Sequence, residues 1–129
     1  MNKAVPFTHT LRVRYSETDA GGVAHHSSYV VWLEQARTEW MRASGKSYRD
    51  IESEGQFLVV TELQIKYLSP ARYDDELIIS VAEECRKRAS VDLVYELAEG
   101  ASGRRVATAS TRLACIDRAG RVCRLPDFS

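Results

Sequence analysis

The spacing of apolar and polar residues changes along this chain, and each change predicts a different element. Apolar or aromatic residues alternate with polar ones over residues 10–15, where Leu11, Val13 and Tyr15 share one side. This period of two predicts a half-buried strand. A helical period follows over residues 28–44. The positions on one face of that helix are Tyr29, Leu33, Ala36, Trp40 and Ala43.

The predicted helix has recognisable ends and more than one apolar side. Ser27 or Ser28 can cap its first turn, and Gly45 suits its C-terminal end. The residues that widen the apolar stripe are Val30, Val31, Trp32 and Met41. We therefore expect a sheet to wrap around this helix, because a flat sheet would leave part of the apolar surface in water.

Most of the remaining chain is strand-like. Residues 46–55 predict a short second helix or a loop that ends at Gly55. Strand patterns follow at residues 57–68, 77–82, 91–98 and 104–117. Residues 83–88 predict a polar hairpin, and a turn at Gly120 precedes a short final strand near Val122. One helix placed after the first strand of an antiparallel meander is an α+β architecture.

Composition and charge narrow the class of protein. The 129 residues, 44% of them hydrophobic, suit one domain over residues 1–129 with a core of its own. The 18 basic and 18 acidic residues balance, so net charge gives no argument for binding nucleic acid or an anionic membrane. The apolar runs are too short for a membrane span, and the N-terminal residues have no apolar signal core.

The cysteines favour a reducing compartment. Cys85, Cys115 and Cys123 are odd in number, widely spaced and outside any CxxC pattern. This arrangement favours reduced thiols over a disulfide framework or a zinc site. We therefore expect a cytoplasmic protein.

Residues 15–29 carry most of the chemically informative side chains. They read Tyr-Ser-Glu-Thr-Asp-Ala-Gly-Gly-Val-Ala-His-His-Ser-Ser-Tyr and join the first strand to the helix. A carboxylate beside a glycine turn can attack or deprotonate, while the free N–H groups of the helix start hold a developing oxyanion. Asp19 is the candidate carboxylate. Its alternative role is to cap the glycine turn, as aspartates often do.

These motifs, in this order, resemble the hotdog-fold acyl-CoA thioesterases, and most closely the 4-hydroxybenzoyl-CoA thioesterase and YbgC-like group. Residues 15–29 match Tyr-x-x-Thr-Asp-x-x-Gly-x-x-x-His-x-x-Tyr. The helix text of residues 29–40, the segment 65–77 and the closing segment 120–126 are similar to the family as well. The resemblance covers about residues 10–126.

The resemblance implies an antiparallel sheet of about five strands wrapped around one long central helix. It also implies hydrolysis of an acyl-CoA thioester to free acid and CoA. Asp19 would act as nucleophile or general base, and the helix start near His26 as the oxyanion hole. Hotdog domains are expected to join sheet edges, which implies a homodimer or a homotetramer with active sites at the interface.

The two histidines of the loop have separate expectations. The main-chain N–H of His26 can point at the thioester oxygen, and its imidazole can bind the carbonyl or orient Asp19. The alternative is a solvated residue that only begins the helix. His25 is expected to point elsewhere. Adjacent histidines do not easily chelate one ion, so we predict neither a metal nor an organic cofactor.

Further residues are candidates for substrate binding. They are Tyr15, Gly22, Tyr29, Thr61, Arg86, Lys87 and Arg88. The glycine leaves room for the thioester. Tyr15 is expected to line the acyl pocket or position Asp19, and Tyr29 to form a hydrogen bond near the site, with a place in the core as the alternative for both. The threonine is carried over from the strand expected to face the helix start. The basic triplet is expected to contact the phosphates of CoA, with a solvated charged turn as the alternative.

Other readings of the same residues stay open. YbgC-like members typically have Tyr where this chain has His25, which leaves the acyl group undetermined. Glu34 and Arg37 are expected to pair along the helix. The alternative function is a non-catalytic module that binds acyl-CoA or an acyl carrier protein. A hydratase or dehydratase is disfavoured, because the loop lacks the pairing of a helix carboxylate with a loop histidine expected there.

Overall fold

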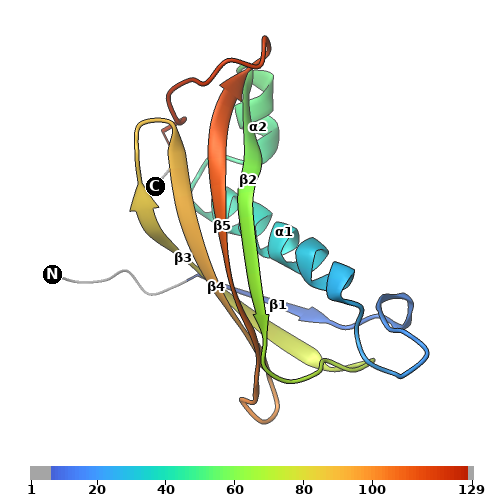
Figure 1. Cartoon of the computed structure of the whole chain (residues 1–129). Coiled ribbons are helices and arrows are strands. Elements are labelled where there is room, and N and C mark those ends of the chain that lie inside the picture. Colours follow the sequence, from blue (N-terminus) through green and yellow to red (C-terminus); the bar gives the residue numbers. More distant parts are fainter. Residues whose placement is uncertain (1–6, 128–129) are drawn as a thin grey trace, which may run out of the picture.

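A computed structural model describes residues 7–127 and shows one antiparallel sheet with a long helix across one face (Figure 1). The strands are β1 (Phe7–Arg12), β2 (Gln56–Tyr67), β3 (Glu76–Arg86), β4 (Ser90–Glu99) and β5 (Arg105–Asp117). The helical elements are a 3₁₀ turn η1 (Tyr15–Glu17), α1 (His26–Ala43) and α2 (Tyr48–Ser53). The predicted α+β arrangement of five strands and one long helix is confirmed.

The order of the strands explains why α1 lies across the sheet. The order is β1-β3-β4-β5-β2, so the two strands that flank the helices in sequence are the two edges. β3, β4 and β5 pair antiparallel as successive strands. The chain must cross from the β1 edge to the β2 edge, and α1 makes this crossing while packing against β1 and β3. The result is a core between one helix and one face of the sheet.

That core follows the alternation of the strands and one face of the helix. The fully buried helix residues are Trp32, Leu33 and Ala36, and the fully buried residues of the central strands include Leu77, Ile79, Leu93 and Leu97. Each leucine or isoleucine side chain removed from water contributes roughly 1.5–3 kcal/mol of transfer free energy. The core is therefore the main source of stability for the helix.

The second apolar side of the helix is not covered by the described residues 7–127. Trp32 and Met41 are buried as expected, but Val30 and Val31 are 43% and 45% exposed. Ala43, predicted on the buried face, is also exposed. The single sheet reaches around only one side of α1, so the expectation of a fully wrapped helix holds for part of its surface.

The first strand is shorter than its alternation predicts. β1 ends at Arg12, and Val13 leaves the ladder because it exchanges main-chain hydrogen bonds with Asp74 and Asp75, each 2.9 Å long. Tyr15 belongs to η1 and is 77% exposed, with its ring edge-to-face on Tyr73. Placing Tyr15 on a strand in the core was therefore wrong. The alternation reflects the burial of Val13 rather than a longer strand.

Two predicted turns also differ. β3 continues through the polar residues 83–86, so the turn occupies only residues 87–89, closed by a 2.8 Å bond from the Lys87 N–H to the Ser90 carbonyl. The polarity of this segment reflects an exposed end of the sheet, not a turn. The predicted strand near Val122 is one isolated bridge to Ile116.

The start of α1 is set by a tertiary contact instead of a serine cap. The helix begins at His26, and the residue before it, His25, makes no side-chain capping bond. The Ser28 hydroxyl donates to the Glu17 carbonyl at 3.0 Å. Gly45 follows the helix in the left-handed region, as expected of a helix end.

Two of the cysteines lie side by side without a disulfide. The Sγ atoms of Cys115 and Cys123 are 3.3 Å apart, and all three cysteines are free. Burial, reinforced by the hydrogen bond to Cys123, raises the pKa of the Cys115 thiol to about 12. Cys85 is exposed.

We expect Cys85 to react first with a thiol reagent at about pH 8, because it is exposed and the reagent can reach its sulfur. Cys115 should react only after unfolding, since it is buried and its pKa is raised. Labelling over time in native buffer and in urea, read by peptide mass spectrometry, measures both rates. Equal labelling of Cys85 and Cys115 in native buffer would contradict this description.

Candidate active site

The turn at residues 18–24 holds Asp19 in a defined conformation. Thr18 and Ala24 form a bridge, and the Asp19 N–H donates to the Val23 carbonyl at 2.9 Å. The Asp19 Oδ1 atom accepts from the main-chain N–H of Gly21 at 2.8 Å and of Val23 at 3.4 Å. The capping role considered for Asp19 is thus real, and it fixes one carboxylate oxygen.

The second oxygen of Asp19 is available for chemistry. The residue is exposed, and no hydrogen-bond donor to Oδ2 is found among residues 7–127. Capping and reactivity are therefore compatible, because the turn orders the carboxylate through Oδ1 and leaves Oδ2 open.

The two glycines of the turn do different things. Gly22 has a φ of 82°, a left-handed conformation that a residue with a Cβ adopts only with strain. A Cβ at Gly21 would lie 3.2 Å from Asp19 Oδ1. Gly22 therefore permits the turn, and Gly21 leaves room for the carboxylate.

The first turn of α1 offers free hydrogen-bond donors. The His25 N–H donates to Glu17 and the Ser28 N–H to His25, at 2.9 and 3.1 Å. Within the described part of the chain, the N–H groups of His26 and Ser27 have no acceptor. Free N–H groups at a helix N-terminus attract negative charge. The expected contribution of His26 is thus joined by Ser27, which the sequence signals only through its place at the helix start.

A cavity of about 360 Å³ opens beside this helix start. Its lining residues are Val23, Ala24, His26, Tyr29, Tyr67, Leu68, Ser69 and Pro70. Most of its surface is apolar, and the two tyrosine rings meet edge to face with centroids 4.9 Å apart. Asp19 is not a lining residue. The strand that carries Thr61 was expected to face the helix start, but Tyr67 at the C-terminal end of that strand, β2, lines the cavity and Thr61 does not.

The side chain of Tyr29 is shared between the core and the cavity. It is 3% exposed and packs on Trp32, so it belongs to the core, yet it also lines the cavity. Burial raises the pKa of the Tyr29 phenol, and a main-chain contact with Ala71 opposes this only in part. The phenol is therefore neutral at physiological pH and can donate a hydrogen bond.

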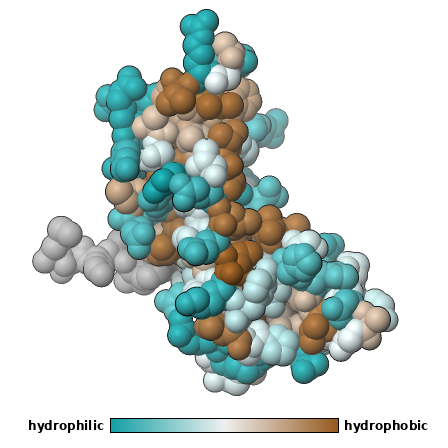
Figure 2. Space-filling view, viewed as in Figure 1, coloured by the Kyte–Doolittle hydropathy of each residue, from teal (hydrophilic) through white to brown (hydrophobic). Residues whose placement is uncertain are grey.

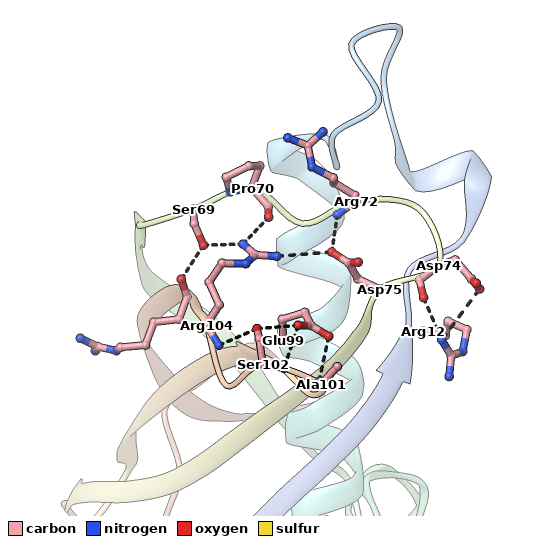
Figure 3. A network of polar contacts seen from close by, with 11 residues as sticks. Arg12, Ser69, Pro70, Arg72, Asp74, Asp75, Glu99, Ala101, Ser102 and Arg104 are labelled. Atoms are coloured by element: carbon pink, nitrogen blue, oxygen red, sulfur yellow. Dashed lines mark hydrogen bonds and ion pairs between the residues drawn. The ribbon is translucent and has the colours of Figure 1, made fainter.

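A polar network holds the segment 69–75 beneath the turn (Figure 3). The Ala24 N–H donates to the Ala71 carbonyl at 2.8 Å, which joins the turn to this segment. Arg104 donates to the Ser69 hydroxyl at 2.6 Å and to the Pro70 carbonyl at 2.8 Å, and its guanidinium lies 3.6 Å from Asp75. One arginine from the β4–β5 turn thus braces one wall of the cavity.

Replacing Arg104 by glutamine should lower the free energy of unfolding by about 1–2 kcal/mol, because hydrogen bonds from a charged donor to this segment are lost. Arg105→Gln is the matched control. Its pair with Glu96 is solvent-exposed, so its loss should cost under about 0.5 kcal/mol. Urea unfolding followed by fluorescence measures both. Equal effects of the two variants would show that the network does not hold the segment.

The remaining candidates lie away from the turn. Thr61 is exposed on β2 and donates to the Arg112 carbonyl at 3.3 Å, about 20 Å along the strand from Tyr67. Arg86 is the last residue of β3 and pairs with Glu83 at 2.6 Å. Because β3 begins beside the turn at Glu76, its far end lies about 33 Å away. Figure 1 shows the β3–β4 hairpin at the opposite end of the sheet.

The expected pair between Glu34 and Arg37 is not formed. No ion pair joins them in residues 7–127, and Arg37 instead donates to the Tyr95 hydroxyl at 3.5 Å. Helical spacing brings such side chains within reach, but the half-buried guanidinium turns toward the sheet. The pairing prediction was wrong for this reason.

The described residues contain neither a metal-binding cluster nor a helix suited to a membrane. Among residues 7–127 no group of three or more histidine, cysteine or acidic side chains is placed to hold a metal ion. In the same residues, no helix is both long and apolar enough for a membrane span.

The chain packs one helix on a sheet and places a carboxylate in the turn before that helix. Comparison with known proteins identifies its family. Residues 13–129 match the family model of the Thioesterase-like superfamily, and the chain belongs to this family.

The relatives carry consistent names. The chain is 32% identical to the acyl-CoA thioesterase YbgC of Haemophilus influenzae over 112 residues, which cover 86% of this chain and 81% of that protein. It is 44% identical to the acyl-CoA thioester hydrolase YbgC of Escherichia coli O157:H7 over 73 residues, 57% of this chain and 54% of that protein. The chain thus spans about half the length of several curated relatives that it matches.

Solved structures confirm the hotdog fold. A protein of Aquifex aeolicus superposes with a TM-score of 0.89 at 30% identity, covering 94% of both chains. The DHNA-CoA thioesterase of Staphylococcus aureus superposes with a TM-score of 0.88 at 31% identity, covering 92% of this chain and 79% of that one.

Proposed function

We propose that this chain hydrolyses acyl-CoA thioesters, with Asp19 as the reacting carboxylate. The observation that carries the proposal is the geometry of one turn: Asp19 keeps a free, ordered oxygen beside a helix start with two free N–H groups. An apolar cavity adjoins that helix start. Membership of the Thioesterase-like superfamily and the names of the YbgC relatives support the same activity.

The proposed chemistry uses these groups in sequence. The acyl group enters the cavity beside Tyr29 and Tyr67, and the thioester oxygen accepts from the N–H groups of His26 and Ser27. Asp19 Oδ2 either attacks the carbonyl carbon, giving a mixed anhydride that water opens, or removes a proton from an attacking water. The CoA thiolate leaves and is protonated, and the free acid is released. No metal or organic cofactor takes part in this scheme.

Asp19→Asn should lower kcat by at least about 100-fold, because the amide can neither attack nor accept a proton, whereas its oxygen still accepts from Gly21. Asp74→Asn, which changes an exposed carboxylate on the neighbouring segment, should keep wild-type activity. Release of thiol from a panel of aliphatic and aromatic acyl-CoA thioesters measures both.

The outcomes separate the two candidate functions. Wild-type thiol release that survives Asp19→Asn would refute the role of Asp19. Binding of acyl-CoA or acyl carrier protein with no thiol release from the wild type would favour the non-catalytic binding module.

We further propose that two copies pair through their β2 edges. β2 has β5 as its only neighbour in the described sheet. The exposed apolar residues Val60, Leu63 and Tyr67 lie along β2. Figure 2 shows apolar surface along this strand down to α1. A long unpaired edge is a template for pairing, and such pairing would cover these side chains.

Antiparallel pairing of β2 would also bring distant candidates toward the cavity. The Gln56 end of one copy would lie toward the Tyr67 end of the other. The β3–β4 hairpin sits at the Gln56 end, because Ala89 bonds to Cys115 and Arg88 to Leu125. Thr61 and the basic residues Arg86, Lys87 and Arg88 would then serve the site of the other copy. A homotetramer and a cytoplasmic location are the wider proposals made from the sequence.

Leu63→Lys should convert the dimer to a monomer, because it places a charge at the middle of the paired edge. Val122→Lys is the control, since Val122 is 69% exposed outside the sheet edge. Sedimentation velocity gives the mass of each variant. A dimer that persists with Leu63→Lys, or a wild-type monomer, would contradict pairing through β2.

A further inference from the structure

Glu17, which directly precedes the turn at residues 18–24, carries a second carboxylate, and its contacts differ from those of Asp19. Glu17 is buried, with a side chain only 9% exposed. Its Oε1 atom accepts from the Arg14 N–H at 2.7 Å, and its Oε2 atom accepts from the Trp32 indole N–H at 3.0 Å. The Arg14 guanidinium also reaches Oε2 at 3.4 Å. Both oxygens are therefore occupied by donors and none is left to react.

The main chain of Glu17 makes a second set of contacts with the start of α1. Its carbonyl accepts from the His25 N–H at 2.9 Å and from the Ser28 hydroxyl at 3.0 Å. One residue thus contacts the helix at its cap, in its first turn and, through Trp32, in its second turn. Trp32 is fully buried, so this anchor point is held by the core.

These contacts set where Asp19 stands relative to the helix start. Asp19 follows Glu17 by two residues, and the Thr18–Ala24 bridge closes the turn between the Glu17 anchor and His25. The geometry points to Glu17 as a positioning residue, which holds the Asp19 turn against the free N–H groups of His26 and Ser27 through its bonds to Trp32 and His25. This inference rests on the proposed function for its effect on rate. Its structural part, the rigidity of the turn, can be measured without any substrate.

Glu17→Gln is the test variant, because it keeps the size of the side chain. Its amide nitrogen must face a donor, either the Arg14 N–H or the Trp32 indole, so one of these bonds is lost. We expect kcat to fall by about 10- to 100-fold with KM changed by less than about twofold, because a small misplacement of the carboxylate affects the reacting geometry rather than binding. Trp32→Phe should act in the same direction.

The double variant tests whether the two residues act through one bond. In the Trp32→Phe background, Glu17→Gln should lower kcat less than it does in the wild type. Tyr48→Phe is the control for an effect on stability alone. It removes a partly buried 2.9 Å hydrogen bond from the Tyr48 hydroxyl to the Leu58 carbonyl, and Tyr48 lies in α2, beyond the C-terminal end of α1. Its kcat should stay at the wild-type value even where its melting temperature falls.

Hydrogen exchange gives a readout that does not depend on catalysis. The hydrogen-bonded amides of residues 18–25 should exchange faster in Glu17→Gln than in the wild type or in Tyr48→Phe. The inference would be overturned if this segment exchanged at the wild-type rate in Glu17→Gln. It would also be overturned if Tyr48→Phe, at equal stability, lost as much kcat as Glu17→Gln. If the wild type releases no thiol, the proposed function fails, and the exchange rates alone decide whether Glu17 holds the turn.

Discussion

The burial of one face of α1 against the sheet is the interaction on which the rest of the structure depends. The edge strands β1 and β2 are joined in sequence only through the helices, so α1 must cross the sheet to connect them. Trp32, Leu33 and Ala36 are buried in this crossing. The hydrophobic contact fixes the helix on the sheet and therefore also fixes the position of the helix start. The groups of the candidate site are arranged around that helix start.

Burial distinguishes two neighbouring carboxylates, those of Glu17 and Asp19. Glu17 faces the core, where both of its oxygens accept hydrogen bonds, as a buried polar group requires. Asp19 faces solvent, where a turn satisfies one oxygen and the other remains open. A buried anchor beside an exposed carboxylate is a way to hold a flexible glycine turn in one arrangement.

A single copy of the chain leaves apolar side chains of α1 and β2 exposed. Val30 and Val31 on α1 and Val60, Leu63 and Tyr67 on β2 are all substantially exposed. The cavity beside Tyr67 opens at the end of the same strand. The association of two copies along β2 that we propose would cover the exposed side chains of β2 and bring the basic hairpin of one copy toward the cavity of the other.

The sequence by itself determined the types of the elements, the position of Asp19 beside a glycine turn and a helix start, and the membership of the hotdog thioesterases. The elements follow from periodicity over short stretches, where each residue restricts its neighbours, and the family follows from the resemblance of the motifs. Tyr15 shows the limit of such patterns, because alternation continues past the last strand residue when Val13 is buried by a loop contact.

Only the tertiary structure decided which groups meet. The end of β2 and the segment braced by Arg104 form the cavity wall, although both are more than 35 residues from Asp19. Arg37 turns to Tyr95 instead of Glu34, and Arg86 lies at the far end of β3. These outcomes depend on strand order and register, which long-range packing sets and local spacing does not record.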